Sequence, residues 1–320
     1  MTPLFIGVDV GGTKVSAAQL GGEPTIAPTD RSSGDALIAQ IAAAAVAAAG
    51  GQEIAAVGIG VPSVVDFAEG RVRSSVNIPL GDMPLRSELH EKLGVPVFVD
   101  NDATVAALAE AHDEHGRLDT RHLVMFTVGT GVGGGIVIDG RLYRGATGAA
   151  GELGHTLIAI DAAVPDAGSF PQPGSLESLA AGHELDLLGR EAAKAHPTSA
   201  LAKLGHEPLG PDVVEAARAG DVIALEALAT LGRRLGVGIA NAINTFDPDV
   251  VAIGGGASAA GALLLDPARA TALSYVLPGV GTRTEIRLAR FGPQAGVRGA
   301  ALLARSELER PQLDESHPDD

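Results

Sequence analysis

Short apolar runs alternate with longer segments of helical periodicity along most of this chain. Apolar, β-branched runs bounded by glycine or proline are typical of strands, and apolar residues three and four apart are typical of helices. The pattern predicts strands over 4–10, 15–20, 54–61, 97–99, 122–128, 136–138 and 250–253. It predicts helices over 34–49, 83–92, 102–112, 213–219, 222–244 and 292–304. This alternation of strands and helices predicts an α/β fold.

One arrangement occurs twice along the chain: a strand, a glycine-rich turn that contains a threonine, and a second strand. The first turn covers 11–14 and the second covers 129–135, with Thr13 and Thr130 in comparable places. We therefore expect two related halves. The length of 320 residues is enough for two lobes.

Composition excludes several classes of function. The chain has no cysteine, which excludes disulfides, thiolate metal sites and a catalytic thiol. A net charge of −16 argues against a nucleic-acid or anionic-membrane partner, since either would need a basic face. The N-terminus has no basic segment leading into an apolar one, and the longest apolar run, 41–49, is too short to span a bilayer. A cytoplasmic protein is expected, with a disordered acidic tail over 309–320.

The first candidate site is the segment Asp9-Val10-Gly11-Gly12-Thr13-Lys14, a strand end followed by a tight turn. Glycines let the backbone turn sharply and approach a phosphate closely. A carboxylate at the strand end can hold Mg²⁺, directly or through water. An ordinary hairpin with a Gly-Gly turn is the alternative, because short motifs carry false positives.

The second candidate is the run from 129 to 135, which has glycines at the spacing of a dinucleotide-binding loop. Such a loop leads into a helix, whereas the strand 136–138 follows here, so an NAD-dependent enzyme is disfavoured. A second phosphate-binding hairpin fits better. Gly254, Gly255 and Gly256 do lie between a strand and a helix, but no well-placed acidic residue follows them on a strand.

The third candidate, Asp100-Asn101-Asp102, stands where a strand gives way to a helix. A simple helix cap at Asp102 is one interpretation, since Asp is among the best capping residues. The functional interpretation makes one carboxylate a general base that accepts the proton of an attacking hydroxyl.

The fourth candidate combines Glu152 and His155, which are flanked by glycines, with Glu177 further along. Carboxylates are strong acceptors for the hydroxyl groups of a sugar. A lone histidine is more often structural, and a zinc site would need further ligands that neither a cysteine nor a nearby histidine provides.

Taken together, these segments resemble the ROK family of bacterial sugar kinases. The resemblance begins with Ile6-Gly7-Val8-Asp9-Val10-Gly11-Gly12-Thr13-Lys14. It continues in order through 57–62, 77–79, 99–103, 129–135, 151–155, 174–177 and 253–256, and covers roughly residues 4 to 306. A series of motifs in order is far more specific than any one of them.

The resemblance implies a duplicated actin-like ATPase fold of the ribonuclease H-like type, with mixed sheets in two lobes and a central cleft. The implied small lobe is 1–118, joined by a C-terminal helix at about 293–308, and it carries the sugar side and the catalytic base. The implied large lobe is 119–292, with contacts to ATP and sugar.

The resemblance also implies roles for the candidate residues, with Asp102 as the catalytic base. The implied sugar-binding residues are Asn77, Asn101, Asp102, Glu152, His155 and Glu177. The implied ATP-binding residues are Asp9, Gly11, Gly12, Thr13, Lys14, Gly129, Thr130, Gly131, Val132, Gly133, Gly254, Gly255 and Gly256. Asp9 would also help to place Mg²⁺.

In one respect the chain departs from the family, many members of which hold a structural zinc through three cysteines and the motif histidine. The cysteine positions fall on Gly168, Phe170 and Ser175, so no zinc is expected. The source of rigidity in the loop 161–174 is then an open question.

Several alternatives stay open within this resemblance. ROK-type regulators sense sugars without catalysis, but they carry an N-terminal helix-turn-helix, whereas the first strand here begins at Leu4. Glucose is the first choice of acceptor, and other hexoses or N-acetylhexosamines are chemically possible. Some relatives use polyphosphate in place of ATP. The family suggests a homodimer.

Overall fold

A computed structural model describes residues 3–75, 77–159 and 170–310. The chain divides into two compact units. Unit 1 consists of residues 1–109, 114–116 and 296–320, and unit 2 consists of residues 110–113 and 117–295. Most of the acidic tail predicted over 309–320 and most of the loop predicted over 161–174 lie outside the described residues.

Unit 1 is built on a five-stranded mixed sheet with the order β3-β2-β1-β4-β7. The central strand β1 is antiparallel to β2 and parallel to β4; β2 and β3 are antiparallel, and β4 and β7 are parallel. The strands are β1 (Leu4–Val10), β2 (Lys14–Gln19), β3 (Thr25–Pro28), β4 (Ile54–Val61) and β7 (Val97–Asn101). A separate hairpin pairs β5 (Ser63–Asp66) with β6 (Arg71–Ser75).

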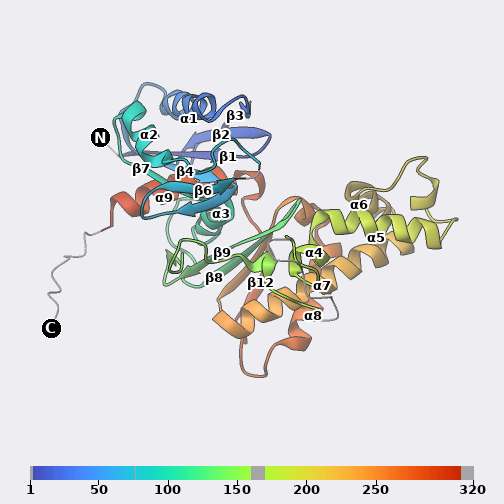
Figure 1. Cartoon of the computed structure of the whole chain (residues 1–320). Helices are drawn as coiled ribbons and strands as arrows, with labels where there is room; N and C mark the ends of the chain where they lie inside the picture. Colours follow the sequence, from blue (N-terminus) through green and yellow to red (C-terminus); the bar gives the residue numbers. More distant parts are fainter. Residues whose placement is uncertain (1–2, 76, 160–169, 311–320) are drawn as a thin grey trace. The chain divides into compact units, whose positions relative to one another are not determined.

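Helices cover both faces of this sheet (Figure 1). On one face, α1 (Gly34–Ala49) and α2 (Leu85–Leu93) share an apolar core with alternate residues of β1 and β4. On the other face lie α3 (Asp102–Glu110) and α9 (Ala295–Leu308). The α9 backbone approaches so closely that a Cβ on Gly58 would lie 1.8 Å from the Ala300 carbonyl oxygen. Glycine at this position of β4 is therefore a packing requirement.

Unit 2 contains a second mixed sheet, with the order β10-β9-β8-β11-β12. Its strands follow the same sequence of directions as the first sheet, two antiparallel pairs followed by two parallel pairs. The strands are β8 (Leu123–Val128), β9 (Val132–Ile138), β10 (Arg141–Leu142), β11 (Val250–Gly254) and β12 (Glu285–Leu288). The repeated topology agrees with the two related halves that the sequence predicts.

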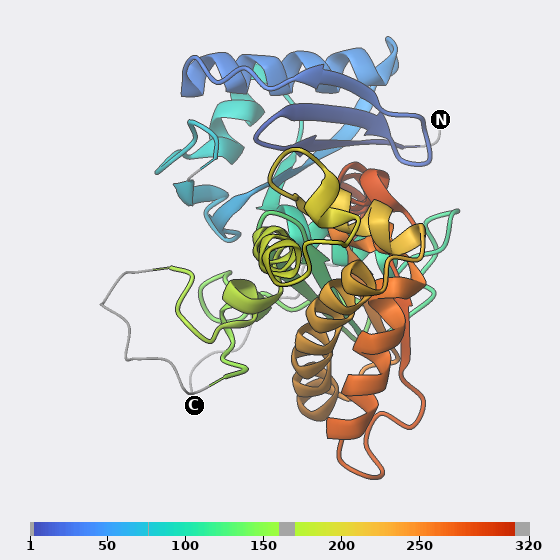
Figure 2. The same ribbon diagram turned by 90° about the vertical axis from the view of Figure 1, so that its right-hand side faces the viewer.

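The helices of unit 2 form its main core with the sheet. The two long helices α7 (Val222–Phe246) and α8 (Ala262–Tyr275) run side by side in both Figure 1 and Figure 2. The other helices are α4 (Leu176–Ala180), α5 (Gly182–Ala195) and α6 (Gly210–Arg218). Short 3₁₀ turns are η1 (Leu153–His155), η2 (Leu201–Lys203), η3 (Gly256–Ala260) and η4 (Gly292–Gln294). Within the described residues, no helix combines the length and apolar character needed to cross a membrane.

The predicted turn over 129–135 is wrong in its extent. The strand β9 begins at Val132, so Gly133, Gly134 and Gly135 lie inside it and pair with β8. Glycine usually weakens a strand, but it is also found where another backbone comes close. Here a Cβ on Gly134 would lie 2.5 Å from the carbonyl oxygen of Gly151. Gly134 therefore makes room for the segment that carries Glu152.

Candidate active site

The first glycine hairpin joins β1 to β2 in unit 1. The Gly11 N–H donates to the Lys14 carbonyl at 2.8 Å, which closes the turn. Thr29, just beyond β3, supports the turn from the side, because its hydroxyl donates to the Gly11 carbonyl at 2.7 Å. Asn77 lies next to the turn, since a Cβ on Gly12 would be 3.5 Å from the Asn77 Cβ. Unit 1 thus brings this predicted phosphate turn and a predicted sugar ligand together.

Asp9 precedes this turn, and its carboxylate packs against the start of α9. A Cβ on Gly296 would lie 2.6–2.8 Å from the Asp9 carboxyl atoms, so a larger residue there would displace the carboxylate. Burial, and then the nearby Asp102 carboxylate, raise the pKa of Asp9 to about 7, while Lys14 acts in the opposite direction. A carboxyl that is hard to ionise without a counter-charge is suited to a cation.

This environment fits a role for Asp9 in holding Mg²⁺. Within the part of the chain that the structure describes, no three His, Asp or Glu side chains form a metal-binding group. Mg²⁺ does not need one, because it is usually held by one or two carboxylates together with water and substrate phosphates.

The segment from 100 to 102 occupies the junction between β7 and α3. The buried Asp100 carboxylate accepts the Asn101 N–H at 2.9 Å. The Asn101 side-chain oxygen accepts the N–H groups of Ala103 and Thr104 at 2.9 and 3.1 Å. These are the bonds of a helix cap, so the interpretation of Asp102 as the cap is wrong. Asp102 is instead the first residue of α3.

Asp9 and Asp102 both lie beside Gly60 of β4. A Cβ on Gly60 would be 3.6 Å from the Asp102 Cα and 3.7 Å from a carboxylate oxygen of Asp9. Because β4 is parallel to its neighbours β1 and β7, the carboxyl ends of these strands meet at one edge of the sheet. The predicted metal ligand and the predicted base are therefore neighbours in unit 1.

The second glycine hairpin joins β8 to β9 in unit 2, with its turn over 129–131. The Gly129 N–H donates to the Gly131 carbonyl at 2.9 Å. A Glu177 carboxylate oxygen accepts the Val132 N–H at 2.8 Å. Glu177 lies on α4, so a predicted sugar ligand directly contacts the predicted phosphate turn.

The start of α5 supports the same turn. The Gly182 N–H donates to the Gly129 carbonyl at 2.7 Å, and a ring nitrogen of His183 lies 3.3 Å from the Thr130 carbonyl oxygen. Sequence reasoning missed Thr29, His183 and Gly296, because each acts on a motif far away in the chain and none belongs to a motif of its own.

Glu152 and His155 lie at η1, which packs on the second hairpin. A Cβ on Gly154 would be 2.0 Å from the Val132 carbonyl oxygen. A carboxylate oxygen of Glu152 lies 3.9 Å from the Nε2 of His155, whose ring meets the edge of Phe170 with centroids 5.5 Å apart. Among the described residues, the buried Nδ1 of His155 has no hydrogen-bond partner.

Backbone bonds join the two ends of the loop that follows η1. The Leu176 N–H donates to the Thr156 carbonyl at 2.8 Å, and the Ile158 N–H donates to the Gly174 carbonyl at 2.8 Å. Ser175, one of the positions where the family carries cysteine, is fully buried and caps α4 through its hydroxyl. Gly168 lies outside the described residues. The loop is thus closed at its base by peptide groups and a serine cap.

The third glycine cluster follows β11 and lies against the second hairpin. Gly255 has a φ of +81°, and a Cβ there would lie 2.4 Å from the Val128 carbonyl oxygen. Both the conformation and the lack of space favour glycine at this position. Gly254 ends β11 and Gly256 begins η3, so the cluster is part of the strand-to-helix turn that the sequence predicts.

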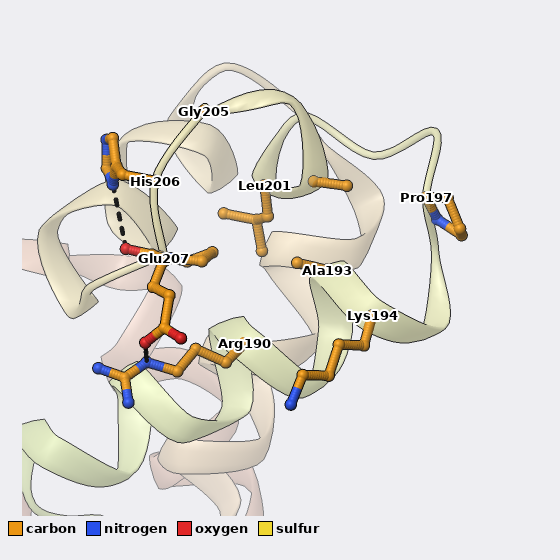
Figure 3. A pocket seen from close by; sticks show the side chains of 10 residues that line it. Arg190, Ala193, Lys194, Pro197, Leu201, Gly205, His206 and Glu207 are labelled. Carbon is orange, nitrogen blue, oxygen red and sulfur yellow. Dashed lines mark hydrogen bonds and ion pairs between the residues drawn. The ribbon is translucent and has the colours of Figure 1, made fainter.

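A surface pocket of about 530 Å³ lies elsewhere on unit 2, between α5 and the segment before α6 (Figure 3). Arg190 and Glu207 form an ion pair across it at 3.2 Å. None of the predicted site residues lines this pocket. In each unit the candidate site is therefore defined by the glycine hairpin of that unit and the residues around it rather than by this hollow.

A family model described as "ROK family" matches residues 5–307. The chain belongs to the ROK family. It is 35% identical over 318 residues to a glucokinase of Halalkalibacterium halodurans, with 95% of each chain covered. The crystal structure of a ROK family glucokinase from Streptomyces griseus, in complex with glucose and AMPPNP, matches with a TM-score of 0.78 and 34% identity over 95% of this chain and 99% of that one. The actin-like ATPase fold and the loss of the family's zinc-binding cysteines are confirmed.

Other relatives differ in the activity that their names state. An N-acetyl-D-glucosamine kinase of Aliivibrio salmonicida is 33% identical over 94% of this chain and 99% of its own length. A putative xylose repressor of a Caldicellulosiruptor species is 33% identical over 80% of this chain, which spans 63% of that protein. Membership of the family therefore leaves the choice of sugar open.

Proposed function

We propose that this ROK family protein is a sugar kinase that transfers the γ-phosphoryl group of Mg·ATP to a hexose hydroxyl. The observation that carries the proposal is the place of Asp102, at the first turn of α3 beside Asp9, with Asn101 serving as the helix cap. Relatives named as glucokinases, which match nearly the whole chain, support the same enzyme class.

In the proposed reaction, Asp102 accepts the proton of the attacking sugar hydroxyl. The hydroxyl oxygen forms a bond to the γ-phosphorus while the bond to the oxygen that bridges the β- and γ-phosphates breaks, and ADP leaves. Phosphoryl transfer of this kind depends on positioning and charge neutralisation more than on covalent catalysis. Mg²⁺ would supply charge neutralisation, and Asp9 would help to hold it.

The remaining roles follow the two units. In unit 1, Asn77 and Asn101 would contact the sugar, and the turn from Gly11 to Lys14 would contact phosphate. In unit 2, Glu152 and Glu177 would accept hydrogen bonds from sugar hydroxyls, and His155 would contact a sugar hydroxyl through a ring nitrogen. The hairpin from Gly129 to Gly133 would contribute backbone N–H groups to the phosphates, and the turn from Gly254 to Gly256 would lie near the adenosine. Backbone donors suit a chain with a net charge of −16, since they hold phosphate without lysine or arginine.

Glucose is the acceptor that we propose first, because the glucokinase from Halalkalibacterium halodurans and the glucose-bound structure from Streptomyces griseus both match nearly the whole chain. An N-acetylhexosamine is the next candidate, given the match to an N-acetyl-D-glucosamine kinase. A sugar-responsive regulator without catalysis is a second candidate function, supported by the match to a putative xylose repressor.

The test is release of ADP from Mg·ATP with purified protein and a panel of hexoses and N-acetylhexosamines. Polyphosphate replaces ATP in a parallel series, with sugar phosphate measured as the product. Turnover that depends on one sugar supports the proposal and names its substrate. The absence of turnover with every sugar and both donors, together with specific DNA binding, would favour the regulator.

A further inference from the structure

Glu177 holds the second glycine hairpin by one of its backbone N–H groups. Its carboxylate oxygen accepts the Val132 N–H at 2.8 Å. The carboxylate lies directly on the turn, since a Cβ on Gly131 would be 2.4 Å from the same oxygen and 3.1 Å from the carboxyl carbon. A glycine at position 131 is what allows this approach.

The direction of the Val132 N–H makes this contact significant. Val132 pairs with Val128 across the hairpin, and the turn inside that pair closes with the bond from Gly129 to Gly131. Paired residues in an antiparallel ladder alternate between bonded and non-bonded positions, so the Val132 N–H points away from β8. Outward N–H groups at a glycine turn are the donors that hold phosphate oxygens. The carboxylate of Glu177 therefore occupies a donor that a phosphate oxygen would use.

The other supports of this turn use its carbonyl groups. Gly182 and His183 contact the carbonyl oxygens of Gly129 and Thr130, at 2.7 and 3.3 Å. Those contacts are compatible with an anion on the N–H side. The first hairpin is likewise supported at a carbonyl group, by the Thr29 hydroxyl on the Gly11 carbonyl. Glu177, by contrast, places a negative charge where the phosphates of a nucleotide would bind.

We infer that Glu177 couples the sugar site to the phosphate site. In the absence of sugar its carboxylate occupies the Val132 N–H and repels the nucleotide phosphates. Sugar hydroxyls then draw the carboxylate away, which frees the N–H and moves the charge. Nucleotide thus binds tightly only when sugar is present, and this limits transfer of the phosphoryl group to water. The inference rests on the proposed function, in which Glu177 is a sugar ligand and the turn holds phosphate.

Glu177→Gln is the variant that separates charge from shape. The amide oxygen can still accept the Val132 N–H, so the hairpin keeps its support, but the negative charge is lost. Glu191→Gln, an exposed position on α5, is the control for loss of one carboxylate elsewhere. Thr29→Val is the control for loss of a hairpin support without a change of charge.

The experiment is calorimetric titration of the full-length protein with a non-hydrolysable ATP analogue and Mg²⁺, without glucose and with glucose at a concentration that saturates each variant. In the wild-type protein glucose should tighten binding of the analogue by about 5- to 150-fold, the usual range of coupling between two sites. Without glucose, Glu177→Gln should bind the analogue about tenfold more tightly than the wild-type protein, which corresponds to about 1.4 kcal/mol. In Glu177→Gln, the factor by which glucose tightens binding of the analogue should fall to about twofold. Glu191→Gln should behave like the wild-type protein, and Thr29→Val should weaken binding equally in both conditions.

The inference would be overturned if, without glucose, Glu177→Gln bound the analogue no more tightly than the wild-type protein does. It would also be overturned if glucose tightened analogue binding by Glu177→Gln as much as it does for the wild-type protein. The proposed function fails separately, through absence of sugar-dependent turnover by the wild-type protein. If sugar-dependent turnover is absent, tighter analogue binding by Glu177→Gln without glucose would still support the blocking role of Glu177. The titration without glucose does not depend on which sugar is the substrate.

Discussion

The side-chain oxygen of Asn101 lies 2.9 Å from the backbone nitrogen of Ala103, so Asn101 caps the helix that Asp102 begins. The Asn101 amide also donates to the Ser63 carbonyl at 3.3 Å, which ties the cap to β5. Both bonds fix the backbone of the residue that we propose as the base. The position of Asp102 therefore depends on its neighbour.

Replacing Asn101 with alanine should remove this cap. Loss of a helix cap typically lowers the free energy of unfolding by about 0.5–2 kcal/mol. Asn101→Asp should retain most of the stability, because Asp is an equally good capping residue. Urea denaturation of both variants measures the difference. An Asn101→Ala protein as stable as the wild type would contradict the capping role.

Asp9 should make stability depend on pH. Its pKa is about 7 in the folded protein, against an ordinary value of 3.8. Between these values the folded protein keeps a proton that the unfolded chain has lost, so stability falls as pH rises through this window. Asp9→Asn cannot ionise and lacks this contribution. The melting temperature of Asp9→Asn relative to wild type should therefore increase between about pH 4 and pH 7, the window between the ordinary and the raised pKa, and level off above it.

Mg²⁺ provides a control for the assignment of this pH dependence to the Asp9 carboxyl. A cation that binds ionised Asp9 should narrow the difference in melting temperature between the two proteins at the upper end of the pH range. Parallel pH profiles for wild type and Asp9→Asn, with and without Mg²⁺, would show that Asp9 does not titrate near neutral pH.

The loop after η1 should be ordered at its base without zinc. Peptide hydrogen bonds join 156–158 to 174–176, and Ser175 caps α4. Metal analysis of the purified protein should find no stoichiometric zinc. Treatment with a zinc chelator, followed by restoration of Mg²⁺, should leave the melting temperature and turnover unchanged. One equivalent of bound zinc, or a loss of stability that added zinc restores, would show that other ligands have replaced the cysteines.

Much of unit 1 is predictable because its elements are local. The apolar run at 4–10, the glycine turn and the helix from Gly34 to Ala49 each carry their own signal, and the structure has strands and a helix at these places. The predicted start of β9 was wrong because three glycines in a row indicate a turn, whereas here they lie inside the strand and Gly134 admits the backbone of a neighbouring segment. Such a contact lies between segments and leaves no local pattern.

The candidate site shows the same limit. The motifs single out Asp102 and Glu177 as candidates, but the sequence alone also allowed Asp102 to be the helix cap, because Asn101 and Asp102 are both good capping residues. The bond from Val132 to Glu177 joins residues 45 apart in sequence, so no motif contains it. Motifs single out individual residues as candidates, whereas the pairing of residues depends on the fold.

The most direct test of the sugar kinase proposal compares glucose-dependent ADP release by the wild-type protein, Asp102→Asn and Asp35→Asn. Asp35 lies in the first turn of α1, so its replacement controls for loss of a carboxylate at a helix start. We expect Asp102→Asn to lower kcat by about 10²–10⁴-fold, the usual contribution of a positioned base, while its melting temperature and glucose affinity stay close to those of the wild type. Asp35→Asn should retain turnover. A near-normal kcat in Asp102→Asn would contradict the role of Asp102 as the general base.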